Sequence, residues 1–137
     1  MNRWKVKQIS GFSIMELMIV ILVVAVLVSL AYPSYTQYVR KSKRGEAQQL
    51  LMNWSINQEI WRSNNTTYAS DTDITPPNHD DYDFTISNVT ATTYTLQAEA
   101  QNDQVKDKAR DGSYCGKTGD ELQLLSTGAK LPADCWN

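Results

Sequence analysis

One carboxylate stands within an otherwise uncharged stretch of the sequence. Glu16 is the only charged residue between Lys7 and Arg40, and it lies near the start of an apolar run. Acidic residues at membrane depth are costly and usually face a partner instead of lipid. The chemistry that Glu16 offers is therefore an ion pair with a cation supplied from elsewhere. A glutamate close enough to the membrane interface to reach water is the alternative interpretation.

The other reactive side chains form no recognisable catalytic or metal site. The sequence has one histidine, His79, no serine in an elbow motif and no glycine-rich phosphate loop. Zinc would need more ligands than Cys115, Cys135 and a histidine far from both in sequence. The aspartates between residues 71 and 83 lack the spacing of an EF-hand calcium loop. We predict no enzyme activity, no cofactor and no metal.

The element that must carry Glu16 is long enough to cross a membrane. From Phe12 to Tyr32 the only polar side chains besides that of Tyr32 are those of Ser13, Glu16 and Ser29. At about 1.5 Å per residue this run would form roughly 31 Å of helix, which matches a bilayer core. The residues before it are basic and contain no acid. An ordinary secretory signal has a shorter apolar region and a small-residue cleavage site, so composition alone favours an uncleaved membrane anchor.

The start of the apolar run resembles the type IV prepilin signal. Gly11 and Phe12 are followed four residues later by Glu16. The resemblance implies that a prepilin peptidase cuts between Gly11 and Phe12 and that Phe12 is then N-methylated. It also implies that Glu16 pairs with the new N-terminal amine of a neighbouring subunit and has a role in assembly. Pro33 stands where pilins commonly have a proline and implies a helix kink, whereas Ala25 replaces a common glycine, which leaves local unwinding before Pro33 open.

The likeness extends into the rest of the chain. Short segments and the C-terminal cysteine pair are similar to minor pilins of the PilE kind, a group that includes the ComP-like DNA-uptake pilins. The segments are Arg44-Gly-Glu-Ala47, Leu50-Leu51, Gln58-Glu59 and Asn65-Thr-Thr-Tyr68. The resemblance implies an α+β type IV pilin fold, with a long N-terminal helix packed on a small antiparallel sheet and a disulfide-closed C-terminal loop. Its regions would be a cleaved leader (1–11), an apolar transmembrane and filament-core helix (12–33), and an amphipathic helix plus periplasmic head (34–137).

Residue periodicity also predicts the helix and the sheet. Mostly apolar residues recur at three- and four-residue spacing after Pro33, which marks an amphipathic helix: Ala47, Leu50, Leu51, Trp54, Gln58 and Trp61. We interpret this stripe as the face that packs on a sheet, rather than as a carbohydrate or base-stacking platform. Alternating runs over 82–87 and 94–101 predict half-buried strands, and a further strand is expected over 121–125. Gly45 inside the helix costs about 1 kcal/mol relative to alanine and indicates a bend or a close contact.

The only two cysteines predict a disulfide. A membrane-anchored chain whose bulk is exported meets an oxidising compartment, in which Cys115 and Cys135 would pair. Closing a loop of about twenty residues contributes roughly 3 kcal/mol to stability. That contribution matters for a small domain whose C-terminal segment has little apolar content.

Charge is distributed unevenly along the chain. From Gly45 onward there are six Lys or Arg against fourteen Asp or Glu, a net formal charge of −8. Just before this acidic head lies a basic collar: Arg40, Lys41, Lys43 and Arg44. We hypothesise that the collar contacts acidic heads of adjacent subunits, and contact with lipid phosphates is the alternative. The positive-inside rule alone would keep the head in the cytoplasm, but the prepilin signal and the cysteine pair predict a periplasmic head.

DNA is not favoured as a partner. Affinity for nucleic acid draws largely on phosphate neutralisation, which an acidic head supplies only where cations are locally concentrated. The best local candidate is the group of Lys106, Lys108 and Arg110. Three aspartates interleave with these cations: Asp103, Asp107 and Asp111.

The sequence therefore predicts a structural subunit, a minor pilin of a type IV pilus (fimbrium). It would span the inner membrane once and then be assembled into the extracellular pilus, supporting twitching motility, cell adhesion or DNA uptake. The expected partners are other pilin subunits, the prepilin peptidase, the pilus assembly machinery and the inner membrane. Three alternatives stay open: a ComP-like DNA-uptake receptor pilin, a type II secretion pseudopilin, and a single-pass membrane protein unrelated to pili.

Overall fold

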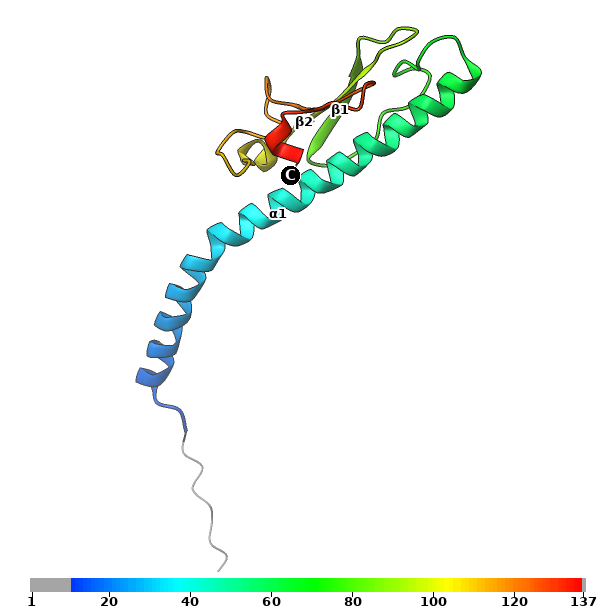
Figure 1. The fold of residues 1–137 in the computed structure, drawn as a ribbon. Helices are drawn as coiled ribbons and strands as arrows, with labels where there is room; N and C mark the ends of the chain where they lie inside the picture. Colours follow the sequence, from blue (N-terminus) through cyan, green and yellow to red (C-terminus); the bar gives the residue numbers. More distant parts are fainter. Residues whose placement is uncertain (1–10, 137) are drawn as a thin grey trace, which may run out of the picture. The chain divides into compact units, whose positions relative to one another are not determined.

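The structure, a computed structural model, describes residues 11–136. The chain divides into two units, one ending at Thr36 and one beginning at Gln37, and helix α1 (Ile14–Asn64) runs through both (Figure 1). The second unit also contains four strands and two short 3₁₀ helices: β1 (Tyr82–Ser87), β2 (Thr95–Ala100), η1 (Asn102–Lys106), β3 (Leu122–Leu125), β4 (Lys130–Leu131) and η2 (Ala133–Trp136). Of the predicted leader 1–11, residues 1–10 lie outside the described residues.

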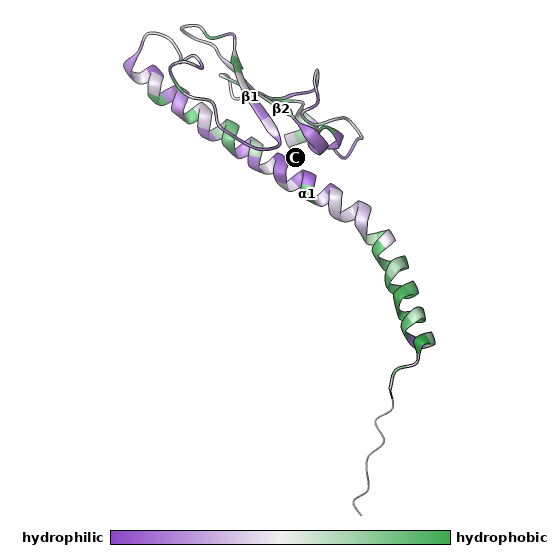
Figure 2. Ribbon diagram, turned by 180° about the vertical axis from the view of Figure 1, so that it is seen from behind, coloured by the Kyte–Doolittle hydropathy of each residue, from purple (hydrophilic) through white to green (hydrophobic). Residues whose placement is uncertain are grey.

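The first part of α1 has apolar side chains on every side and one charged residue, Glu16. Its large side chains from Ile14 to Leu30 are all exposed, and Figure 2 shows this part of the helix as strongly hydrophobic. Over residues 11–136, α1 is the one helix whose length and composition would allow it to cross a membrane. The helix continues through Ala25 and Pro33 without a break, so no unwinding precedes the proline. Pro33 lacks the N–H of a regular helical residue, and the kink expected there stays a prediction.

The second part of α1 buries one face. Five of its side chains are buried and follow the helical spacing of three and four residues: Arg44, Ala47, Leu51, Trp54 and Gln58. The predicted stripe is thus confirmed in its centre, whereas Leu50 and Trp61 at its edges are only half-buried. The charged Arg44 lies on the same face, which the apolar pattern did not predict.

The sheet is antiparallel throughout, with the strand order β1-β2-β3-β4. Side chains alternate between buried and more exposed along β1, β2 and β3, as expected for strands with one covered face. The buried face and α1 share one core, which includes Leu51, Trp54, Phe84, Leu96 and Leu122. Three predicted strands are confirmed within a residue of their expected bounds, while the two-residue β4 is too short to show alternation.

The connection after α1 is fixed by a buried amide. The Gln58 side chain donates from Nε2 to the Ala69 carbonyl at 3.1 Å, and its Oε1 accepts from the Ala69 N–H at 2.9 Å. A buried peptide group needs such partners because leaving them unpaired costs free energy. Gln58 therefore holds the start of the loop between α1 and β1 against the helix.

Candidate functional site

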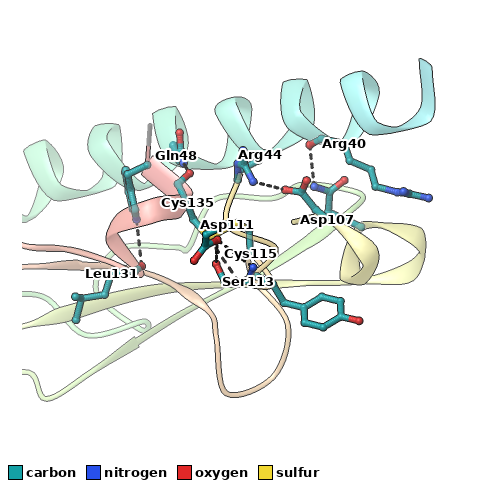
Figure 3. Close-up of a disulfide and its surroundings, with 12 residues drawn as sticks. Arg40, Arg44, Gln48, Asp107, Asp111, Ser113, Cys115, Leu131 and Cys135 are labelled. Atoms are coloured by element: carbon teal, nitrogen blue, oxygen red, sulfur yellow. Dashed lines mark hydrogen bonds and ion pairs between the residues drawn. A yellow bond between two sulfur atoms is a disulfide. The ribbon is translucent and has the colours of Figure 1, made fainter. Parts of the chain in front are cut away.

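The segment after β2 is held against α1 by polar contacts that begin in η1. Asp103 Oδ2 accepts from Arg40 Nη2 at 2.7 Å, and Asp107 Oδ2 accepts from Arg44 Nη1 at 3.0 Å. Between them, Gln104 Nε2 donates to the Arg40 carbonyl at 2.9 Å. Figure 3 shows Arg44 of α1 directed toward Asp107 beside the disulfide. These contacts fix the position of residues 102–107 on the helix.

The Arg44–Asp107 ion pair is buried. The two side chains are 6% and 1% exposed, and the neighbouring Gln104 also donates to the Tyr82 hydroxyl at 2.9 Å. Burial raises the pKa of the Asp107 carboxyl even though the Arg44 guanidinium acts in the opposite direction. Asp107 Oδ1 and Gln104 Oε1 have no hydrogen-bond partner within residues 11–136. The network therefore carries a desolvation cost that its ion pair only partly offsets.

The predicted disulfide is present. Cys115 and Cys135 are bonded, with 5.6 Å between their Cα atoms, and both are buried. The Cys135 carbonyl accepts from Gln48 Nε2 of α1 at 2.7 Å. Gly116 packs so closely that a Cβ there would lie 3.0 Å from the Tyr82 ring, and its φ of +98° suits glycine. In the part of the chain that the structure describes, no cluster of three or more His, Cys, Asp or Glu could hold a metal ion.

Three members of the basic collar have acidic partners within the same head. Besides the pairs of Arg40 and Arg44, Lys43 Nζ lies 2.8 Å from Asp81 Oδ2. The proposed contact of the collar with other subunits or lipid stays a prediction, but three of its charges are already paired internally. Lys41 is therefore the position at which the collar can be tested without removing one of these ion pairs.

Among the cations interleaved with the aspartates of residues 103–111, only Lys106 forms an ion pair with one of them within the described residues. Asp103 and Asp107 turn toward arginines of α1. Asp111 accepts from the Ser113 N–H and hydroxyl, which hold the pKa of its carboxyl below the usual value. Lys106 pairs with Asp103 at 2.8 Å. Lys108 and Arg110 form no ion pair within residues 11–136, and the expectation that DNA is not favoured as a partner stays a prediction.

The available cations are Lys108, Arg110 and Lys117, none of which forms an ion pair within residues 11–136. All three are exposed. The Lys108 and Lys117 ammonium groups lie 4.6 and 4.8 Å from the centre of the Tyr114 ring, within reach of cation–π attraction. Arg110 lies in a turn that the Gly112 N–H closes by donating to the Ala109 carbonyl at 3.1 Å.

A groove of about 670 Å³ lies beside these cations. Its charged lining comprises the basic residues Lys41, Arg44, Lys108 and Arg110 and the acidic residues Asp111 and Asp134. We call this groove, with its four lining cations, the basic groove. Guanidinium and ammonium groups can bind phosphate or carboxylate oxygens. Nothing in the linear order brings Lys41 and Arg44 together with residues 108–110, which is why sequence reasoning did not find this site.

The residues of the predicted prepilin signal lie at the start of α1. Gly11 and Phe12 precede the helix, and Glu16 is in its first turn. All three are exposed, and the Glu16 carboxylate has no ion pair among the residues that the structure describes. A cation for Glu16 would thus come from outside residues 11–136 of its own subunit. The cleavage, the methylation and the assembly role of Glu16 stay predictions.

Comparison with known proteins places the chain in a family. The family model described as "Type IV minor pilin ComP, DNA uptake sequence receptor" matches residues 33–119, more than half of the chain. Among solved structures, a type IV pilin from Shewanella oneidensis is similar at 26% sequence identity and a TM-score of 0.55. The similarity covers 72% of this chain and 98% of that pilin. No curated protein matches.

The fold, the disulfide and the family match agree. A long N-terminal helix, a four-stranded antiparallel sheet and a C-terminal disulfide are the architecture expected of a type IV pilin. The chain belongs to the ComP family of type IV minor pilins and is a minor pilin of a type IV pilus.

Proposed function

We propose that this minor pilin is made as a precursor, is cleaved between Gly11 and Phe12, and works by assembly rather than catalysis. The observation that carries the proposal is that every large apolar side chain of α1 from Ile14 to Leu30 is exposed. So much apolar surface requires cover, which lipid provides before assembly and other pilin subunits provide afterwards. Residues 12–33 hold the subunit in the inner membrane, with the head of residues 34–137 in the periplasm, and later lie within the extracellular fibre.

Cleavage also supplies the partner that Glu16 lacks. A cut after Gly11 creates a positively charged amine at Phe12, and N-methylation retains the charge. In an assembled fibre, the amine of one subunit pairs with the Glu16 carboxylate of its neighbour, which offsets the cost of placing either charge in apolar surroundings. Because that offset requires good geometry, the pair sets the register between subunits.

Analysis of the mature N-terminus tests this proposal. We expect protein recovered from cells that contain a prepilin peptidase to begin with methylated Phe12, as judged by intact mass and N-terminal peptide mass. Protein from cells that lack the peptidase is the control and should retain Met1. A chain that begins with Met1 in both strains would contradict the proposal and leave the uncleaved membrane anchor as the explanation.

We propose as a second function that the head binds DNA during uptake. The observation in favour is the distribution of charge: Asp103 and Asp107 are paired with α1, and Asp111 is bonded to Ser113. Three cations of the basic groove, Lys41, Lys108 and Arg110, form no ion pair within residues 11–136 and, together with Lys117, can meet phosphates on a head whose total charge is negative. The family model, described as a DNA uptake sequence receptor, supports the same function. Twitching motility and adhesion are the other processes that the pilus would serve.

A salt titration of duplex binding tests the DNA proposal. Each phosphate contact contributes about −0.9 to the slope of log K against log salt concentration. The triple variant Lys108→Ala, Arg110→Ala and Lys117→Ala is expected to lose most of its affinity and to reduce the slope by about 2 to 3. Lys130→Ala, which removes an exposed cation that does not line the groove, is the matched control. Binding by the triple variant with an unchanged slope would exclude this surface.

A further inference from the structure

A second groove, of about 460 Å³, lies where α1 meets the loop that follows it. Its lining comes from the last two turns of α1, from the next residue and from the loop: Asn57, Ile60, Trp61, Asn64, Asn65 and Ile74. At about 1.5 Å per residue, Trp61 lies about 25 Å along the helix from Arg44 of the basic groove. The two grooves are therefore separate, and the proposed function does not use the second one.

Trp61 differs from the centre of the helical stripe because its indole remains accessible. Trp54 is 1% exposed in the core, whereas Trp61 is half-buried and its neighbour Ile60 is 60% exposed. The Trp61 indole N–H has no acceptor within residues 11–136, and it is not one of the buried groups left unpaired there. An indole presents an apolar surface together with one hydrogen-bond donor. Both are available to a ligand in this groove.

Three asparagines contribute unused polar groups to the same groove. The exposed Asn57 amide makes no hydrogen bond within residues 11–136, so its donor and its acceptor are both free. Asn65 Nδ2 donates to the Trp61 carbonyl at 2.8 Å. Asn64 Nδ2 donates to the Ser63 hydroxyl at 3.1 Å. These bonds restrain the two amides and leave their Oδ1 atoms as acceptors, so little ordering is needed when a ligand binds.

The lining of this groove also indicates which ligand it would accept. None of the residues of 11–136 that line it is charged. A phosphate or an ionised side chain would therefore lose hydration there without gaining a counter-charge. The apolar lining favours a ligand with an apolar face, and the amides and the indole N–H favour hydroxyl groups around that face. A pyranose ring has this form, because its faces carry C–H groups and its rim carries hydroxyls.

We propose that this groove binds one pyranose ring of a neutral glycan. A C–H face of the sugar lies on the Trp61 indole, and its hydroxyls form hydrogen bonds with Asn57 and with the Oδ1 atoms of Asn64 and Asn65. One ring makes few contacts, so its Kd is on the order of 1 mM. The proposal goes beyond the proposed function, since it requires neither cleavage after Gly11 nor binding of DNA.

Saturation-transfer difference NMR on the full chain, in a detergent without a sugar headgroup, tests the proposal. The probes are the methyl glycosides of glucose, galactose, mannose and N-acetylglucosamine, and we expect at least one to bind. Trp61→Ala should abolish the signal. Asn57→Ala, which breaks no hydrogen bond of residues 11–136, should weaken binding about fivefold, the effect of one lost hydrogen bond. Asn53→Ala, an exposed asparagine one turn earlier that does not line the groove, is the matched control and should bind normally.

The outcomes separate this site from the DNA proposal. Binding of none of the four glycosides would overturn the sugar site, as would equal binding by Asn57→Ala and Asn53→Ala. The triple variant Lys108→Ala, Arg110→Ala and Lys117→Ala should bind the sugar like the native protein. Loss of sugar binding in that variant would place the ligand on the basic groove and reject the site at Trp61. Loss of DNA binding in the triple variant alone would leave the sugar site intact.

Discussion

Asp107→Ala is expected to lower the stability of the head by about 3–5 kcal/mol, because it leaves the Arg44 guanidinium buried without its counter-charge. Arg44 is 6% exposed, and Asp107 Oδ2 is the one carboxylate oxygen that it contacts within residues 11–136. Chemical unfolding of the full chain in detergent, followed by circular dichroism, measures the loss. Asp103→Ala removes the more exposed ion pairs with Arg40 and Lys106 and is the control, for which a much smaller change is expected. Equal losses in the two variants would contradict this account of the buried pair.

A paired replacement shows whether the ion pair itself stabilises the fold. Burial raises the pKa of the Asp107 carboxyl despite the adjacent arginine, and removing two charges from water can cost as much as their attraction contributes. The double variant Arg44→Met with Asp107→Leu should therefore recover most of the loss seen in Asp107→Ala, or exceed the native stability. Stability no better than in Asp107→Ala would show that the ion pair contributes more than its desolvation costs.

The pH dependence of the head's stability follows from the direction in which the pKa of Asp107 is shifted. Because the native pKa is raised, the folded state retains a proton on Asp107 that the unfolded state loses first. The contribution of Asp107 to stability therefore declines as the pH rises through the ordinary carboxyl range toward the raised value. Asp103 and Asp111, whose pKa values are lowered, contribute in the opposite sense and lose their effect as the pH falls. In a plot of stability against pH, Asp107→Asn should remove the decline at rising pH and leave the loss at falling pH that Asp103 and Asp111 cause.

Removing the disulfide is the other large effect that we expect. Replacing Cys115 and Cys135 with alanine should cost about 3 kcal/mol, since the bond closes a loop with a sequence separation of 20. The expected loss appears in chemical unfolding, and reduction of the native protein should reproduce it. Gln48→Ala, which removes the hydrogen bond to the Cys135 carbonyl, is the control and should cost about 1 kcal/mol. A double variant no less stable than this control would show that packing alone holds the C-terminal segment.

The two stability predictions also bear on DNA binding. Arg44 and Asp107 help to position residues 108–110, and the disulfide anchors Tyr114 and Lys117 beside them. Variants that loosen either element should weaken DNA binding indirectly by disordering the basic groove. The triple cation variant changes charge without removing any ion pair of residues 11–136, so its effect on the salt slope reports binding itself.

Local patterns in the sequence predicted most of the fold. The apolar run from Phe12 to Tyr32, the helical stripe through Leu51 and Trp54, and the alternation over 82–87 each indicated an element that the structure contains. Such patterns are readable because burial of one face repeats with the period of the element. The two-residue β4 is too short to carry a repeated pattern and was not predicted. The stripe included Leu50 and Trp61 but did not indicate that they would be only half-buried.

The sequence by itself determined the elements, the candidate prepilin signal, the cysteine pair and the acidic character of the head. Only the tertiary structure decided which charges remain available. Arg40 and Arg44 each meet an aspartate 63 residues away, and this pairing leaves Lys108 and Arg110 free beside Lys41. The physical reason is that ion pairs depend on distances of a few ångströms in space, and chain order does not determine these distances until helix and sheet have packed.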